Sequence, residues 1–205
     1  MKNLIFLFII TIWSTVSIKA QNNPSRFRIG STASIEENLS SKTMAFAKYT
    51  GYSVKNDKTN YRFGLNVEYV LKNEITINSA INYSNKDFTG TYYCMVCDFS
   101  VPPSPESIDF RFLEIPLTMR YYFFPEKFRL FGELGLNNQF VLSKETTDNL
   151  FGLGIKFGAG MEYNLGRDIA LQLLLDYNKG ITGFYRESNF KVDYLAFGIG
   201  MMKRL

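Results

Sequence analysis

Two cysteines, three positions apart, are the residues of this chain whose spacing most directly suggests chemistry. Cys94 and Cys97 are the two cysteines of the 205-residue sequence, and a C-x-x-C pair can be a redox motif, half of a zinc site or a disulfide. A zinc site here would have to recruit two carboxylates, because the chain has no histidine and no second cysteine pair. A thioredoxin-like motif would need a helix. A small local disulfide in an oxidising compartment is therefore the favoured interpretation.

The absence of histidine also removes the common forms of nucleophilic catalysis. Ser-His-Asp and Cys-His sites both depend on an imidazole base, and the sequence contains none. The pairs Gly152, Gly154 and Gly158, Gly160 resemble pieces of a phosphate-binding loop, but they alternate along a predicted strand. No Walker-type loop or carboxylate-rich metal motif is present. We therefore expect a protein that is not an enzyme and binds no cofactor or metal.

Charged residues occur singly on the polar faces of the predicted strands. The predicted network comprises Arg62, Glu68, Glu114, Arg120, Arg129, Glu133, Lys156, Glu162 and Asp176. Counting from the short turns places Glu68, Arg120, Arg129 and Glu162 in a lower, balanced layer, and the other five in an upper layer with three acids and two bases. Buried charges that stay unpaired cost several kcal/mol each. We expect a salt-bridged plug that stabilises a filled barrel, with an ion pathway or gate as the alternative.

Positioning these side chains requires strands, and alternation with period two predicts eight of them. The expected strands span residues 26–36, 61–71, 75–88, 110–124, 127–142, 151–164, 169–181 and 191–203. Residues 44–54 are also strand-like and would extend the first hairpin. Connections alternate between short turns (71–74, 125–126, 165–168) and longer polar loops (37–60, 89–109, 143–150, 182–190). This pattern is typical of an eight-stranded antiparallel transmembrane β-barrel with both termini in the periplasm.

The two faces of each predicted strand indicate the barrel's surroundings. In the sixth strand, Phe151, Ile155 and Phe157 share one face, whereas glycines, Lys156 and Glu162 share the other. A soluble lipocalin-like barrel, which is the alternative, would carry a wet face rich in Lys, Glu and Thr. A crowded polar face instead fits a narrow lumen filled by side chains. Aromatic residues beside the short turns predict an interfacial girdle; they are Tyr69, Phe123, Phe124, Phe128 and Tyr163.

The N-terminus predicts export. Lys2 precedes an apolar run from Leu4 to Ile12, and Lys19 and Ala20 follow a stretch of small polar residues. This is the layout of a signal peptide cleaved after Ala20, because the run is shorter than the roughly 20 residues of a membrane-spanning helix. We therefore expect a cleaved signal over residues 1–20 and a barrel domain over residues 21–205.

The composition excludes two further classes of protein. Aromatic residues make up 16% of the chain and charged residues 20%, which is not the composition of a disordered protein. Removing residues 1–20 takes away Lys2 and Lys19 and leaves 21 bases against 19 acids. A net charge of +2 gives no case for nucleic-acid binding.

Several segments of the chain resemble the PorT-like outer-membrane β-barrel family common in Bacteroidetes. The resemblance covers the mature chain and rests on residues 19–21, 26–30, 112–117, 120–123, 152–154, 158–162 and 197–200. Within it, Leu113-Glu114-Ile115-Pro116-Leu117 is the most specific segment. The chain ends in Arg204-Leu205 rather than in the terminal aromatic residue common in outer-membrane proteins. The resemblance implies the fold and the location, and its named member is associated with type IX secretion.

These observations predict a monomeric outer-membrane barrel in contact with lipid, which acts through its extracellular loops in binding or envelope structure. A protein partner in the envelope or in the secretion machinery is expected. Two alternatives stay open, namely an accessory component of protein secretion or assembly and a narrow, porin-like channel.

Overall fold

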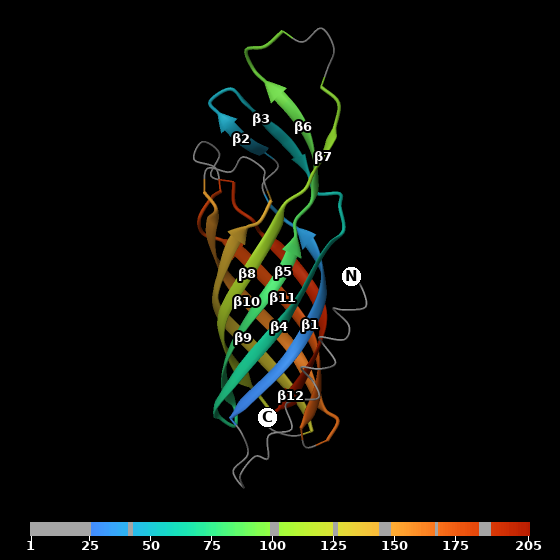
Figure 1. Ribbon diagram of the computed structural model, residues 1–205, viewed down its shortest axis with the longest axis vertical. Coiled ribbons are helices and arrows are strands. Elements are labelled where there is room, and N and C mark those ends of the chain that lie inside the picture. The colour runs from blue at the N-terminus through green and yellow to red at the C-terminus, as the bar shows by residue number, and fades with distance from the viewer. Residues whose placement is uncertain are drawn as a thin grey trace.

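A computed structural model shows a closed barrel with a small sheet standing on one end (Figure 1). The structure describes residues 26–40, 43–98, 103–124, 127–143, 149–166, 168–184 and 190–205. The expected signal peptide, residues 1–20, lies outside the described residues. The described residues contain no helix of the length and apolarity needed to cross a membrane.

The barrel consists of eight antiparallel strands that follow one another around the wall. They are β1 (Phe27–Asn38), β4 (Asn60–Lys72), β5 (Ile75–Asn85), β8 (Arg111–Tyr122), β9 (Phe128–Val141), β10 (Phe151–Asn164), β11 (Ile169–Gly180) and β12 (Tyr194–Arg204). Each strand pairs with its neighbours in sequence, and β1 closes the wall by pairing with both β4 and β12. The predicted all-β, eight-stranded up-and-down barrel is thereby confirmed. Closure leaves no unpaired strand edge in the wall.

Alternation along each strand produces the two faces of the wall. On β11, the residues Ala170, Gln172 and Asp176 are buried, whereas Leu171 and Leu173 between them are exposed on the outside. Successive side chains of a strand point to opposite faces, so a polar lumen and an apolar exterior follow from the sequence pattern. The expected strand boundaries hold to within three residues at each end.

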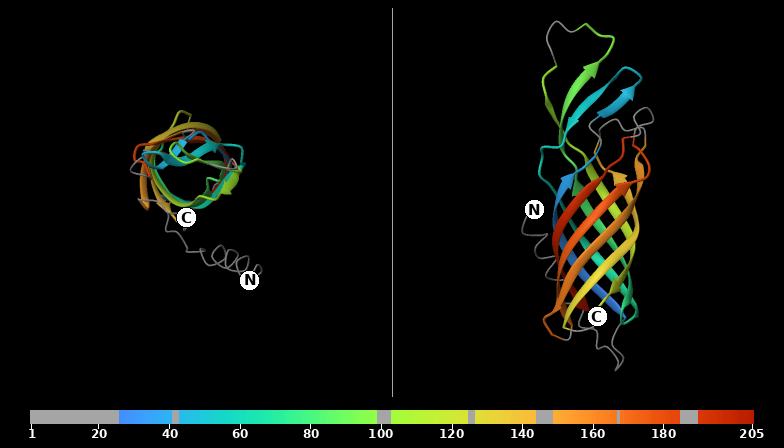
Figure 2. Two further views of the ribbon diagram at one scale, coloured as in Figure 1. Left: turned by 90° about the horizontal axis from the view of Figure 1, so that it is seen from above. Right: turned by 180° about the vertical axis from the view of Figure 1, so that it is seen from behind.

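The start of β1, the end of β12 and the turn between β4 and β5 lie at one end of the barrel, opposite the small sheet (Figure 2). The backbone N–H of Leu205 donates to the carbonyl of Phe27 at 3.1 Å, which fixes the last residue beside the start of β1. We call this end the turn end and the opposite end the sheet end.

The small sheet is the main departure from the sequence prediction. It contains β2 (Thr43–Ala47), β3 (Thr50–Lys55), β6 (Phe88–Cys94) and β7 (Glu106–Ile108), in the order β2-β3-β6-β7. The strand-like segment 44–54 was expected to extend the first hairpin, and it does form a hairpin. Residues 89–109 were expected to be a longer polar loop, and this is wrong for the two segments that form strands: β6 pairs with β3 from Thr89 to Cys94, and β7 pairs with β6.

Candidate functional site

Charged side chains fill the lumen and form one connected network. The nine predicted charges all lie in it, and three further residues join them. Bases and acids alternate at every step from the turn end to the sheet end: Arg129, Glu162, Arg28, Glu68, Arg120, Glu133, Lys156, Asp176, Arg62, Glu36, Lys86 and Glu114. We call these twelve residues the lumen network. Six bases face six acids, so the network is neutral as a whole.

Half of the network follows directly from strand register. Three ion pairs join residues that lie opposite each other on neighbouring strands, namely Arg28–Glu68, Arg120–Glu133 and Arg129–Glu162. The first two have N–O distances of 2.7 and 2.8 Å. Opposite charges at directly paired positions stabilise a sheet, so these pairs favour the observed register of three strand pairs.

Other ion pairs cross the lumen and connect strands that do not touch each other. Arg28 Nη2 lies 2.7 Å from Glu162 Oε2, which joins β1 to β10. Arg62 Nη2 lies 2.5 Å from Asp176 Oδ2, which joins β4 to β11. Because these contacts span the interior, the lumen network occupies the cross-section of the barrel instead of only coating its wall.

The two expected layers merge through one residue. Glu133 was placed in the upper layer, but its carboxylate contacts Arg120 of the lower layer at 2.8 Å and Lys156 of the upper layer at 2.8 Å. Lys86 and Glu36 add one base and one acid to the upper layer, so its surplus of one acid stays. Arg28 gives the lower layer one extra base, and the contact between Arg120 and Glu133 joins the two layers into a neutral whole. Arg120 and Glu133 lie directly opposite each other because β8 ends at Tyr122 and β9 begins at Phe128, whereas counting from a turn at 125–126 gives the two residues different depths.

Sequence reasoning missed three charges and two tyrosines. Arg28, Glu36 and Lys86 each continue the buried face of their strand by period two, so alternation could have found them. Tyr122 and Tyr194 are fully buried at the two levels of the network. The Tyr122 hydroxyl donates to Glu162 at 3.0 Å.

Tyr194 connects the charges to an apolar cluster above them. Its hydroxyl donates to Glu114 at 2.8 Å, and Lys86 Nζ lies 3.8 Å from the centre of its ring. The same ring belongs to a buried cluster that fills the sheet end of the lumen and carries the base of the small sheet. Its members are Met44, Val54, Phe88, Ile108, Phe110, Phe112, Phe184, Phe190, Val192, Tyr194 and Ala196. We call this the apolar cap.

The glycines of β10 leave the space that these side chains occupy. A Cβ on Gly152 would collide with the ring of Phe184 in the apolar cap, and a Cβ on Gly158 would lie 2.5 Å from Glu133 Cγ and 2.9 Å from Asp176 Oδ1. These glycines therefore act as gaps for bulky or charged neighbours, and neither takes part in a phosphate-binding loop.

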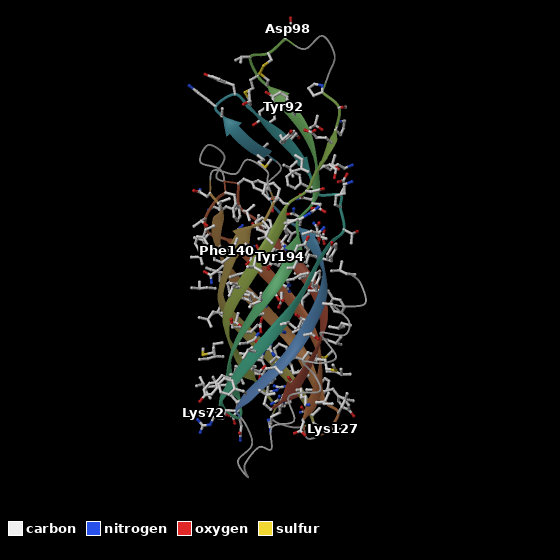
Figure 3. All side chains as sticks on the ribbon, in the orientation of Figure 1. Lys72, Tyr92, Asp98, Lys127, Phe140 and Tyr194 are labelled. Atoms are coloured by element: carbon white, nitrogen blue, oxygen red, sulfur yellow. A yellow bond between two sulfur atoms is a disulfide. The ribbon has the colours of Figure 1, made fainter. Side chains whose placement is uncertain are left out.

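The small sheet projects beyond the barrel and ends in the disulfide loop (Figure 3). Cys94 and Cys97 are joined, with their Cα atoms 5.3 Å apart. The two residues inside this loop, Met95 and Val96, are 74% and 72% exposed. At the base of the sheet, a hydrogen bond from the Thr89 hydroxyl lowers the pKa of the Asp57 carboxyl below its ordinary value.

No metal-ligating cluster of three or more acidic or cysteine side chains occurs within the described ranges. The carboxylates of the lumen network are separated from one another by arginine and lysine. The arrangement neutralises charge and fixes side chains in place.

Residues 19–182 match the family described as outer membrane protein beta-barrel domain. The chain belongs to this family. The match spans more than half of the sequence and includes the strands that carry most of the lumen network. A comparison with curated protein sequences finds no match.

Solved structures of outer-membrane barrels share the fold. OprG from Pseudomonas aeruginosa is similar with a TM-score of 0.57 and 16% identity, over 89% of this chain and 97% of that one. Neisserial surface protein A gives 0.52 and 15%, over 90% and 100% of the two chains. The N-terminal β-barrel domain of Pseudomonas aeruginosa OprF gives 0.50 and 14%, over 89% and 100%. At these identities the likeness concerns the fold alone.

The exterior of this outer-membrane barrel has the surface that the family name implies. Large apolar side chains such as Leu65, Ile81 and Phe197 are at least 60% exposed around the wall. In water, so large an apolar surface would promote aggregation, whereas in a bilayer it is the lipid-facing band. Of the aromatic residues expected to form a girdle, Phe123, Phe124, Phe128 and Tyr163 are exposed and Tyr69 is partly exposed.

Proposed function

We propose that this protein is a non-enzymatic, non-conducting outer-membrane barrel that binds a protein partner through its projecting sheet. One observation carries the proposal: the lumen network and the apolar cap fill the interior, whereas the sheet extends beyond the barrel and ends in two exposed apolar side chains. An eight-stranded barrel has an interior just wide enough for side chains. The working surface is then outside the barrel.

The sheet has the features of a protein-binding surface. Its edges are formed by β2 and β7, and an edge strand can pair with a strand of another chain. Met95 and Val96 are held by the disulfide loop, so their contact surface is ordered before a partner arrives. Ordering in advance lowers the entropy lost on binding. In the proposed orientation the termini lie in the periplasm, the sheet faces the outside and the barrel is monomeric.

Site-specific photocrosslinking in intact cells tests this function. A photoreactive residue at Val96 should give an adduct of defined mass, whereas one at Leu150 should not. Leu150 is the matched control because it is 66% exposed at the same end of the barrel but lies off the sheet. Position 49 lies beside the tip, because the carbonyl of Tyr49 accepts from the N–H of Met95 at 2.9 Å. Crosslinking from a photoreactive residue placed at position 49 should weaken in a Met95→Ser, Val96→Ser variant. Equal labelling at positions 96 and 150 would contradict the proposal.

The resemblance to PorT-like barrels of Bacteroidetes supports a narrower alternative, in which the partner belongs to a type IX-like secretion machinery. The segment Leu113–Leu117 carries that resemblance, and it also supplies Glu114 to the lumen network. Pull-down of the crosslinked protein from outer membranes separates the two proposals. Recovery of a secretion component would support the alternative, and recovery of a partner unrelated to secretion would exclude it.

A further inference from the structure

A polar hollow of about 540 Å³ lies at the turn end of the lumen, directly beneath the lumen network. Its described lining comes from the turns at 71–74 and 165–168, from Lys127 and from the ends of barrel strands that include β12. The side chains used below are Arg28, Thr76, Lys127, Arg129 and Arg204. We call this hollow the turn-end vestibule. Figure 3 places Lys127 at this end of the barrel, far from the small sheet.

The turn-end vestibule carries more positive charge than the network above it can neutralise. Glu68 is the one acidic side chain among the described residues that line the hollow, and it is already paired with Arg28 and Arg120. The lumen network is neutral by itself, with six bases and six acids. Lys127 and Arg204 are outside the network, and neither has a carboxylate within ion-pair distance in the described part of the chain. They add two positive charges to the vestibule.

Two hydrogen-bonding atoms at this hollow also lack partners among the described residues. Thr76 is 1% exposed, and its hydroxyl makes no hydrogen bond. Arg129 uses Nη2 to contact Glu162, but its buried Nε–H has no acceptor. A buried donor without an acceptor destabilises the folded protein, and such groups are rare in native proteins. Both groups therefore leave the turn-end vestibule with hydrogen-bonding capacity that the described residues do not satisfy.

We propose that the turn-end vestibule binds a phosphate group. The guanidinium groups of Arg28, Arg129 and Arg204 and the Thr76 hydroxyl line it from different strands, and the Lys127 ammonium lies at its edge, 5.1 Å from the centre of the Tyr163 ring. Such a set of donors suits an anion with several acceptor oxygens. A soluble phosphate compound and a phospholipid headgroup share this chemistry. Position favours the headgroup as the source, because the exposed rings of Phe123, Phe128 and Tyr163 mark the membrane interface at the same end.

Phosphorus-31 NMR on the purified protein in maltoside micelles tests the proposal with inorganic phosphate as the probe. The phosphate resonance should broaden as protein is added, and the broadening should saturate. Arg204→Gln and Thr76→Val should each weaken binding, and the double variant should weaken it about tenfold, which corresponds to about 1.4 kcal/mol. Lys179→Gln is the matched control, because Lys179 lies at the sheet end and is paired with Asp193 at 2.5 Å. Each variant must keep heat-modifiable migration on gels. If Thr76→Val fails to fold, Arg204→Gln tests the site alone, because Arg204 lies at the end of a strand.

A second arm distinguishes the two sources of phosphate. Native mass spectrometry after incubation with phosphatidylglycerol should show retained lipid that Arg204→Gln reduces, if the headgroup is the ligand. Saturable binding of inorganic phosphate without lipid retention would assign the site to a soluble compound. Binding of neither probe, or binding that Arg204→Gln and Lys127→Gln leave unchanged, would overturn the proposal.

Discussion

Arg62 on β4 and Asp176 on β11 form an ion pair of 2.5 Å across the lumen, although β1 and β12 separate their strands in the wall. Arg62 also lies 3.5 Å from Glu36 and 3.8 Å from Glu114. One guanidinium thus neutralises parts of three carboxylates in the upper half of the barrel. The lumen network depends on such shared residues, because alternation of charge continues through them.

Replacing Arg62 by methionine should destabilise the barrel by about 3–5 kcal/mol, because the change leaves buried carboxylates without full neutralisation. The double variant Arg62→Met, Asp176→Leu should be markedly more stable than the single variant, since it removes an acid together with the base. Unfolding by urea in lipid vesicles, followed by circular dichroism, measures both. The matched control is Lys179→Met at the exposed Lys179–Asp193 pair, where solvent screens the interaction. Equal losses at both sites would show that the lumen network does not carry stability.

A single methyl group added at Gly158 should also destabilise the barrel. Gly158→Ala should cost about 1–3 kcal/mol, because the new Cβ would press on the side chains of Glu133 and Asp176. Gly132→Ala provides the comparison, since its Cβ would meet Phe123 at an ordinary contact distance of 3.7 Å. The same unfolding measurement applies to both. A Gly158→Ala variant as stable as Gly132→Ala would mean that the lumen is looser than described.

The outward face should reject charge in proportion to its depth in the bilayer. Leu117 lies at the middle of β8 and is 55% exposed. Leu117→Arg should lower the free energy of unfolding in vesicles by about 2–4 kcal/mol, as expected for arginine on the lipid face near the midplane. Leu150→Arg, at the sheet end, should have little effect. A soluble barrel would tolerate both substitutions alike, so equal effects in vesicles would contradict the membrane assignment.

The disulfide should order the tip of the sheet without supporting the barrel. Cys94→Ser with Cys97→Ser should leave the unfolding transition of the barrel unchanged, because the bridge closes a loop of only a few residues. The variant should nevertheless reduce photocrosslinking at Val96. Alkylation followed by intact mass measurement gives the oxidation state. Two alkyl groups added without prior reduction would show that the cysteines are free thiols in the native protein.

Strand number, strand faces and the nature of the lumen could be predicted because all three depend on period-two alternation. The faces of β10 and β11 are clear in the sequence, since bulky apolar residues alternate with glycine and charge. The first strand is less clear in its middle, because Ser31 and Ala33 on its outer face are as small as Thr32 and Ser34 on its inner face. Arg28 and Glu36 nevertheless continue that inner face by period two.

Two features could not be predicted, because they depend on contacts between segments far apart in sequence. β6 becomes a strand by pairing with β3, and its own sequence between Phe88 and Cys94 has weak alternation. The contacts between Arg28 and Glu162 and between Arg62 and Asp176 join residues 134 and 114 positions apart, and they depend on how the tilted strands are staggered around the closed wall. Local patterns determine which residues face inward, whereas the register around the closed wall determines which of them meet.

Single-channel recording in planar lipid bilayers tests the filled lumen most directly. The account predicts no discrete conductance steps for the purified barrel, and none for a Glu114→Ala variant, because the remaining lumen network and the apolar cap still occupy the interior. Stable, ohmic steps from the unmodified protein that Glu114→Ala alters would contradict the account and establish a narrow channel through the barrel.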